Sequence, residues 1–454
     1  MLLKTVIASF LLWILWASTM TVLCHAQDQI DTSQSTFLIP ATDEGLPGAG
    51  PIRRYEWMQN VWSQRRATFA RRAEQDHGAV VFLGDSITQG WKDDFAGDFA
   101  GMKVANRGIS GDTTRGMLIR LQEDVLSLDP AAVVLLMGTN DLEELAEPAT
   151  IAGNVQLILD SLKKHNPAMP VVLCQVMPSS ASKKRSAESI QQLNELLVDM
   201  VSGDRQVTMV DTWTLFADAN GDAIAAEFPD LLHPNRAGYE KWRDALIPLF
   251  ETLGLLEPEV TSLTIEPGFV ALHNGKDLTG WELRPTPEPM RKSRERWLSR
   301  NPKGIHWPLV EEKLVLDGKT QTPNERFVAR HGRIIVTTPP DGRSIEQLWT
   351  SKDFSGDLTL RLQFRATPNA DSGVFLRGPQ LQCRDFKLAG PYKELIKYRP
   401  QKWNDLEIVV KDDVARCTCN GEVLEEALAI PADGPIGLEG DRGQIEYRHI
   451  RIKQ

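Results

Sequence analysis

The chain of 454 residues is long enough for two domains with terminal segments, because a single hydrophobic core rarely grows to this size. Hydrophobic residues make up 42% and charged residues 25% of the sequence, a composition that is typical of a globular protein and argues against disorder. The formal net charge is −10 and no long basic run occurs, so we expect no nucleic-acid surface.

The first 26 residues have the composition of an export signal. Lys4 stands near the start, a dense apolar stretch runs from Val6 to Ala17, and Gln27 follows a candidate cleavage site. We therefore expect an exported protein, either periplasmic or extracellular. The competing interpretation is an uncleaved membrane anchor, since no charged residue occurs between Lys4 and Asp28. Only in that case do we expect contact with a membrane.

Export permits disulfides, and four cysteines follow the candidate cleavage site: Cys174, Cys383, Cys417 and Cys419. Cys174 falls in an apolar strand, so we expect it in the core. Cys417 and Cys419 stand two apart on an expected strand, which is a poor geometry for bridging each other. A bridge from Cys383 to one of them remains open. None of the spacings resembles a zinc site.

Residues 27–50 are rich in Gln, Thr, Pro and Gly and carry no periodic pattern, so we expect a flexible tether. From Ile52 to Glu74 the sequence has neither Pro nor Gly, and its apolar spacing predicts a helix. The residues expected on the buried face of this helix are Tyr55, Met58, Val61, Trp62 and Phe69.

Residues 51–256 alternate short apolar segments with helical patterns, which is typical of an α/β domain with a doubly wound parallel sheet. Five strands are expected, at residues 80–83, 103–105, 132–137, 171–176 and 207–210. Amphipathic helices are expected between them, and the last helix runs from about Asn235 to Leu253. The acidic segment 218–222 resembles the start of a calcium loop but lacks the closing Glu, so we interpret it as a turn.

The pattern changes at a linker, residues 257–268, and residues 269–454 read as an all-β domain. Apolar and polar residues alternate from Leu358 to Phe364, and Asn420-Gly421 predicts a tight hairpin. These features favour a jelly-roll sandwich. The basic, Pro-interrupted segment from Arg284 to Lys303 could bind a polyanion, but we interpret it as a solvated loop.

A serine ends the first expected strand at the edge where open α/β sheets bind ligands. Ser86 follows the apolar run and Gly84, and a nucleophilic serine needs a base and a carboxylate that orients the base. Asp230 and His233 share one loop after the last strand, and their spacing lets carboxylate and imidazole meet within one turn. The sequence thus predicts a triad of Ser86, His233 and Asp230.

Two further loops are expected to leave the same edge and to offer donors for an oxyanion, Asn106-Arg107-Gly108 after the second strand and Gly138-Thr139-Asn140-Asp141 after the third. The backbone N–H of Gly108, in Asn106-Arg107-Gly108, can approach a substrate closely because glycine has no side chain. The side-chain amide of Asn140 can join it together with the Ser86 N–H. Asp141 is expected to brace its loop rather than to react.

These blocks resemble the SGNH, or GDSL-type, hydrolase family. The resemblance rests on Gly84-Asp85-Ser86, on Gly108, on Asn140 and on Asp230 with His233, in the family's order over about 200 residues. It implies a three-layer α/β/α domain of flavodoxin-like type, a Ser-His-Asp triad, an oxyanion hole from Ser86, Gly108 and Asn140, and neither metal nor cofactor. The Gly-x-Ser-x-Gly elbow of α/β-hydrolases is absent, because Thr88 occupies the place of its second glycine.

The second domain resembles the 3-keto-disaccharide hydrolase domain, a jelly roll related in shape to concanavalin-like lectins and glucanases. The resemblance rests on residues 269–281, 371–377 and 434–438. Members commonly carry Glu-x-Gln-x-x-Asp, whereas here Gln380 stands in place of that Glu, and an amide cannot titrate as a carboxylate does. The resemblance implies sugar binding; whether this domain also cleaves glycans, and with which residues, stays open.

Together these features suggest an exported serine esterase that removes acyl groups, acetyl in particular, from carbohydrate. A second hypothesis makes the jelly-roll domain the main enzyme, a 3-keto-disaccharide hydrolase with an accessory deacetylase. A third makes the chain a carbohydrate-binding protein with a decayed hydrolase, which the intact triad disfavours. The sequence does not determine the oligomeric state.

Overall fold

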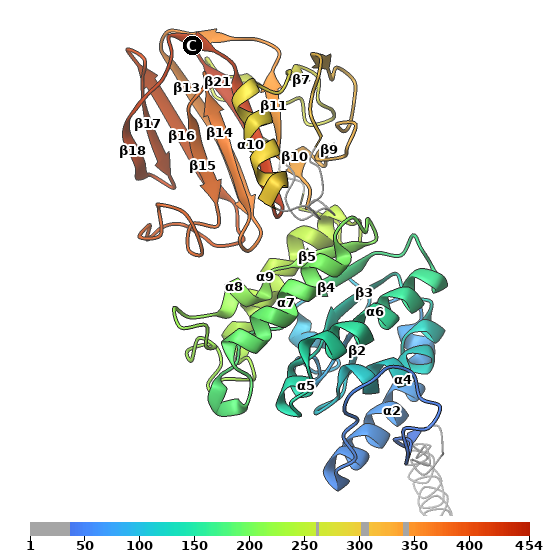
Figure 1. The fold of residues 1–454 in the computed structure, drawn as a ribbon. Coiled ribbons are helices and arrows are strands. Elements are labelled where there is room, and N and C mark those ends of the chain that lie inside the picture. Colours follow the sequence, from blue (N-terminus) through green and yellow to red (C-terminus); the bar gives the residue numbers. More distant parts are fainter. Residues whose placement is uncertain (1–36, 260–262, 301–307, 339–344) are drawn as a thin grey trace, which may run out of the picture. The chain divides into compact units, whose positions relative to one another are not determined.

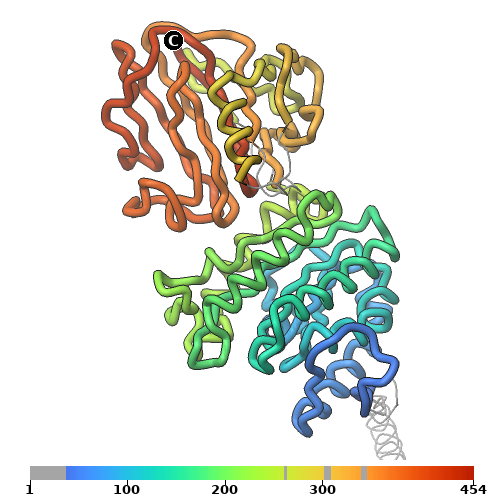
Figure 2. The backbone as a smooth tube through the Cα atoms, in the orientation of Figure 1, coloured from blue at the N-terminus to red at the C-terminus, as the bar shows by residue number. Residues whose placement is uncertain are grey.

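The computed structural model describes residues 37–259, 263–300, 308–338 and 345–454. The expected export signal, residues 1–26, lies outside these residues. The colours of Figure 2 show that the α/β part and the all-β part are each built from one continuous stretch of chain. The predicted fold classes of both parts are confirmed.

The first domain is a parallel five-stranded sheet in the order β2-β1-β3-β4-β5, with helices between the strands (Figure 1). All residues of β1 and β3 are buried, as expected for strands that are covered on both faces. Its strands are β1 (Val80–Gly84), β2 (Val104–Gly108), β3 (Ala132–Leu136), β4 (Val171–Cys174) and β5 (Val207–Val210). All five predicted strands are thus present, four with shifted ends and the fifth with the predicted bounds; Asn106 to Gly108 belong to β2 rather than to a loop.

The helices begin at polar caps that the sequence supplies. Thr113, Ser186 and Asn235 accept backbone hydrogen bonds at the starts of α4, α7 and α9, and Pro148 opens α6, where its missing N–H costs nothing. The α-helices are α3 (Ser86–Gly90), α4 (Thr114–Asp124), α5 (Thr139–Glu143), α6 (Pro148–His165), α7 (Ala187–Val201), α8 (Thr212–Phe216) and α9 (Arg236–Thr252); short 3₁₀ turns are η2 (Phe95–Gly97), η3 (Leu126–Leu128) and η4 (Ala181–Lys183).

The predicted N-terminal helix is α2 (Glu56–Asp76), which begins four residues later than the pattern suggested. Met58, Trp62 and Phe69 are buried as predicted, whereas Tyr55 precedes the helix and is exposed. In the segment before it, Arg54 donates to the backbone oxygen of Pro40 at 2.7 Å.

The second domain is a sandwich of antiparallel sheets with one apolar core between them. One sheet has the order β18-β17-β16-β13-β21-β10-β9, with β6 beside β21, the other the order β15-β14-β20-β11-β7-β8, and β12 pairs with β19. The strands are β6 (Val270–Ala271), β7 (Trp281–Leu283), β8 (Leu314–Val315), β9 (Phe327–Arg330), β10 (Arg333–Val336), β11 (Glu346–Thr350), β12 (Phe354–Ser355), β13 (Leu358–Ala366), β14 (Asp371–Leu376), β15 (Gln380–Arg384), β16 (Asn404–Lys411), β17 (Val414–Cys419), β18 (Glu422–Ala429), β19 (Asp433–Gly434), β20 (Ile436–Arg442) and β21 (Ile445–Lys453).

Local predictions for this domain have mixed outcomes. The alternation along β13 buries Leu358, Leu360 and Leu362, and Asn420-Gly421 closes the β17–β18 hairpin with both φ angles positive. The prediction of a loop for the basic segment from Arg284 to Lys303 is wrong in one respect, because the segment contains helix α10 (Glu288–Arg300). Pro285 and Pro287 precede the helix and Pro289 lies in its first turn, where proline is tolerated, so these three do not interrupt it.

The cysteines form no disulfide among the described residues. Cys174, Cys383, Cys417 and Cys419 are all buried free thiols. The bridge from Cys383 that the sequence left open is therefore absent, and Cys174 lies in the core as predicted. These thiols act as small apolar side chains in the packing.

Candidate active site

The carboxyl ends of the three adjacent strands β2, β1 and β3 lie level with one another. Gly84 of β1 pairs in register with Gly108 of β2 on one side and with Leu136 of β3 on the other. Because Ser86 and Asn140 follow two of these strand ends directly, the topology gathers the predicted nucleophile and oxyanion donors at one sheet edge.

Ser86 opens the short helix α3, which is fixed against the sheet. Oδ1 of the buried Asp85 accepts the N–H of Ile87 at 2.9 Å and so caps this helix. The side-chain amide of Asn106 donates to the backbone oxygens of Thr88 at 2.7 Å and Lys92 at 2.9 Å. Burial raises the pKa of Asp85 to about 6, although the Ile87 hydrogen bond and neighbouring positive charges oppose this shift.

Gly108 is required by close packing between β2 and α3. A Cβ at this position would lie 2.2 Å from the backbone nitrogen of Gln89, far inside van der Waals contact. Any other residue would push the helix that begins with Ser86 away from the sheet.

Ser86, His233 and Asp230 form a continuous hydrogen-bonded chain. The Oγ of Ser86 lies 2.9 Å from Nε2 of His233, and Nδ1 of His233 lies 2.7 Å from Oδ2 of Asp230. Because Asp230 accepts at Nδ1, that nitrogen carries the proton in the neutral ring, which leaves Nε2 free to accept the proton of Ser86. The structure thus brings the three predicted triad residues together in the order that nucleophilic catalysis needs.

The loop that carries Asp230 and His233 holds itself in shape. Oδ1 of Asp230 accepts the backbone N–H groups of His233 at 2.7 Å and Leu232 at 3.1 Å, and Leu231 takes a left-handed φ of 59°. Partial burial alone would raise the pKa of Asp230, but the hydrogen bonds from the His233 ring and from these N–H groups lower it to about 2. Asp230 therefore stays ionised and can stabilise an imidazolium.

The predicted oxyanion donors differ in their availability. The Ser86 N–H stands in the first turn of α3, where backbone N–H groups lack a partner inside the helix. The amide of Asn140, whose residue is 3% exposed, donates to the backbone oxygen of Asp112 at 2.9 Å and carries a second hydrogen. The N–H of Gly108, however, donates to Oδ1 of Asn106 at 2.8 Å. It is thus already engaged, and an oxyanion would have to share or displace that bond.

Two buried carboxylates support the segment around Asn140, which forms the short helix α5 rather than the predicted loop. Asp112 pairs with Arg120 at 2.8 Å, and Asp141 accepts the hydroxyl of Thr114 at 2.6 Å and its N–H at 3.0 Å. Burial raises the pKa of Asp112 to about 6 and that of Asp141 to about 7, in both cases against opposing hydrogen bonds. Asp141 thus joins α5 to α4, which agrees with a bracing role.

Sequence reasoning missed two arginines at this site. Arg53 and Arg185 donate to Oδ1 of Asn140 at 3.2 and 3.1 Å. Arg185 lies in the loop after β4, so its place at the same sheet edge was a usable signal. Arg53 lies far upstream of Ser86, and no pattern around it indicates a role.

The structure also tests the predicted turn at residues 218–222. Asp218 accepts the N–H groups of Asn220 at 2.8 Å and Asp222 at 3.0 Å, so segment 218–222 is a turn as predicted. Among the described residues, no group of three or more His, Cys, Asp or Glu side chains could hold a metal ion. In the same part of the chain, no helix combines the length and apolar character needed to span a bilayer.

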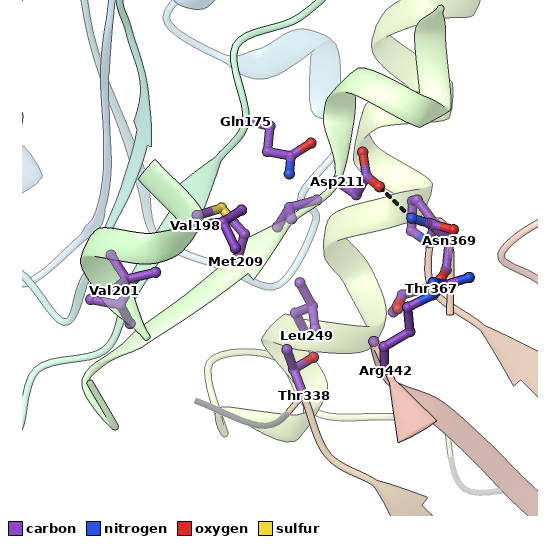
Figure 3. A pocket seen from close by; sticks show the side chains of 14 residues that line it. Gln175, Val198, Val201, Met209, Asp211, Leu249, Thr338, Thr367, Asn369 and Arg442 are labelled. Carbon is purple, nitrogen blue, oxygen red and sulfur yellow. Dashed lines mark hydrogen bonds between the residues drawn. The ribbon is translucent and has the colours of Figure 1, made fainter. Parts of the chain in front are cut away.

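Figure 3 shows a pocket of about 200 Å³. Its lining includes Gln175, Met209 and Arg442, and Asn369 donates to Oδ2 of Asp211 at 2.8 Å beside it. It contains none of the predicted catalytic residues.

Comparison with known families separates the chain into two matched regions. Residues 82–241 match the model of the GDSL-like Lipase/Acylhydrolase family, and residues 268–453 match that of the 3-keto-alpha-glucoside-1,2-lyase-like domain. These regions coincide with the two parts for which the sequence suggested a resemblance. The first contains Ser86, Gly108, Asn140, Asp230 and His233; Arg53 lies outside both.

Two similar proteins and one similar solved structure each cover less than half of this chain. Platelet-activating factor acetylhydrolase IB subunit alpha2 of Homo sapiens is 27% identical over 211 residues, which is 45% of this chain and 90% of that protein. Subunit alpha1 of Rattus norvegicus is 28% identical over 204 residues, or 42% of this chain and 85% of that protein. Among solved structures, a GDSL-like lipase from Bacteroides thetaiotaomicron is 24% identical with a TM-score of 0.36, covering 41% of this chain and 98% of that one.

Proposed function

We propose that this chain, which carries a GDSL-like lipase/acylhydrolase domain followed by a 3-keto-disaccharide hydrolase-like domain, is a serine esterase that removes acyl groups, acetyl in particular, from carbohydrate. One observation carries the proposal. The hydroxyl of Ser86 is joined through His233 to Asp230 by contacts of 2.9 and 2.7 Å. This arrangement supplies a nucleophile, its base and the group that orients the base.

The geometry supports acyl transfer in two steps. Oγ of Ser86 attacks the ester carbonyl while its proton passes to Nε2 of His233, and Asp230 stabilises the imidazolium that forms. The Ser86 N–H and the Asn140 amide donate to the oxyanion. His233 then returns the proton to the leaving alcohol, which leaves an acylated Ser86. Water, losing a proton to His233, attacks this ester, and His233 returns that proton to Oγ of Ser86 as the acid leaves.

The choice of acetyl and of carbohydrate rests on separate supports. The curated relatives of the first domain are named as acetylhydrolases, which favours a small acyl group. The second domain is similar to a family named for 3-keto-glucosides, which favours a sugar as the alcohol part of the ester. An acetylated sugar is therefore the substrate that the similarities of both domains favour.

Replacing Ser86 with Ala tests the esterase proposal. Turnover of p-nitrophenyl acetate and release of acetate from a panel of acetylated oligosaccharides should both be abolished, because no other group takes the place of the nucleophile. Comparison with butyrate and octanoate esters measures the preference for acetyl. Full activity of the S86A variant would refute the assignment of Ser86, and a preference for octanoate would refute that of acetyl.

The match of residues 268–453 favours a second candidate function, cleavage of a 3-keto-glucoside by the jelly-roll domain with the esterase in an accessory role. The full-length S86A variant separates the two, since it removes only the ester chemistry. Cleavage of a 3-keto-disaccharide by this variant would favour the second candidate, whereas binding without cleavage would favour a sugar-holding role.

We further propose that the chain is exported, on the composition of its first 26 residues. Expression in a bacterium and N-terminal sequencing of the secreted product should place the mature start near Gln27. Recovery of the intact N-terminus in the membrane fraction would instead support the anchor.

A further inference from the structure

The amide of Asn140 is held in one orientation by two arginines. Its Oδ1 accepts from Nη1 of Arg53 at 3.2 Å and from Nη2 of Arg185 at 3.1 Å, while its Nδ2 donates to the backbone oxygen of Asp112 at 2.9 Å. The side chains of Arg53 and Arg185 are only 6% and 2% exposed. A guanidinium can only donate, so the acceptor end of the amide must face both arginines.

This orientation decides whether Asn140 can serve an oxyanion. With Oδ1 bound by the guanidinium groups, one hydrogen of Nδ2 binds Asp112 and the other remains for the substrate. A flipped amide would turn its N–H groups toward two cations and its oxygen toward the developing negative charge, and both contacts would be repulsive. The arginines therefore exclude the unproductive orientation.

The charges around Asn140 indicate orientation rather than net positive charge as the effect. Arg53 pairs with Glu144 at 2.7 Å and also with Glu143, and Arg185 pairs with Glu143 at 2.7 Å. Two carboxylates thus balance two guanidinium groups. Since the cluster is neutral as a whole, its influence on the reaction should pass through the amide that it holds.

Arg53 comes from a segment upstream of the matched family region. The segment Gly45–Arg53, here called the strap, is bound at several points. Arg115 donates to the backbone oxygens of Pro47 and Gly50 at 3.2 and 3.0 Å, and Thr113 donates to that of Pro51 at 2.8 Å. The backbone of Ala49 also exchanges two hydrogen bonds with the Asn154 amide. Part of the segment expected as a flexible tether is thus held in place.

We infer that Arg53 and Arg185 are positioning residues for the oxyanion donor Asn140, and that the strap Gly45–Arg53 is a working part of the hydrolase. The inference rests on the proposed esterase function and adds to it a requirement for residues outside the matched region. It implies that a fragment beginning at the family match, residue 82, would lack part of its oxyanion site.

The Arg53→Met variant of the full chain is the first test. We expect kcat for p-nitrophenyl acetate to fall about tenfold to a hundredfold with little change in KM, because a misplaced donor loses part of the 10²- to 10³-fold that an oxyanion contact supplies. Arg54→Met is the matched control, since Arg54 bonds to Asp43 and to the backbone of Pro40. It should retain full activity.

A double-mutant cycle with Asn140→Ala identifies the route of the effect. If Arg53 acts through the amide, R53M should lose most of its effect in the N140A background. In the chain that keeps Asn140, R53K should retain part of the kcat that R53M loses. An unchanged kcat in R53M, or an equal loss in both backgrounds, would overturn the inference. Should R53M fail to fold, R53K and Arg185→Lys in the same cycle give the same decision.

A second readout separates this inference from the esterase proposal. Oγ of Ser86 attacks a fluorophosphonate at phosphorus while its proton passes to His233; fluoride leaves, and the phosphoryl oxygen occupies the oxyanion position. Should the wild-type chain hydrolyse no ester, the esterase proposal fails, yet the labelling rate of Ser86 still tests the arginines. Equal rates for R53M and wild type would refute their positioning role.

Discussion

The two sides of Ser86, the proposed oxyanion side with Asn140 and the proposed base side with His233, are built in opposite ways. On the oxyanion side Asn140, Asp112 and Asp141 are 3%, 1% and 0% exposed and belong to a buried polar network. On the base side the side chains of His233 and Asp230 are 42% and 48% exposed. The oxyanion side is assembled from distant segments, whereas the base side is one loop that bonds to itself.

This difference separates catalytic from structural roles. A buried polar group that loses its partner carries a desolvation cost, so changes on the oxyanion side should affect folding as well as rate. The exposed loop makes few such contacts, so changes there should affect the reaction almost alone. Measurements that follow rate and stability together can therefore test the contrast.

The largest effect is expected for His233→Ala. Removal of the general base should lower kcat by about 10⁴-fold or more, in line with other Ser-His-Asp sites. His233 is exposed and its pair with Asp230 is screened by solvent, so the free energy of unfolding should fall by no more than about 1 kcal/mol. Activity and thermal unfolding of the same preparation check both statements, and marked destabilisation would contradict the proposed contrast.

The Asp230→Asn variant should come next. The new side-chain oxygen can still accept the N–H groups of Leu232 and His233, so the loop should keep its shape. The charge that orients and stabilises the His233 ring is lost, and kcat should fall by about 10²- to 10⁴-fold. The loss should be smaller than for H233A, since the base itself remains; a fall of less than tenfold would exclude a catalytic role for Asp230.

The sequence alone predicts the base side better than the oxyanion side. The spacing of Asp230 and His233 places both residues in one loop, and the structure brings them to Ser86. By contrast, the contacts of Arg53 and Arg185 with Asn140 span 87 and 45 residues. Such contacts depend on how whole segments pack, which no local pattern records.

Two local features explain other differences between prediction and structure. Asn106 lies two residues before Gly108, the spacing at which an Asn side chain bonds to a following N–H, and this bond engages the donor assigned to the oxyanion. The prolines before α10 suggested a loop, although proline at a helix start is compatible with the helix that follows. In both cases the pattern was visible but admitted two structures.

The smallest effect, and the one that distinguishes the two sides by sign, concerns stability against pH. Burial raises the pKa of Asp141 to about 7 in the folded chain, so the stability it contributes is fully present below about pH 4 and is lost as pH rises toward 7. The free energy of unfolding of the Asp141→Asn variant should lack this dependence on pH, which amounts to at most about 4 kcal/mol between pH 4 and pH 7. Asp230, whose pKa is lowered to about 2, should act oppositely, with stability present above about pH 4 and lost as pH falls toward 2. Urea unfolding of wild type, D141N and D230N from pH 2 to 8 measures both slopes. For each variant, the difference from wild type in the free energy of unfolding is followed against pH. Differences that change with pH in the same direction for D141N and D230N would contradict the electrostatic contrast between the two sides of Ser86.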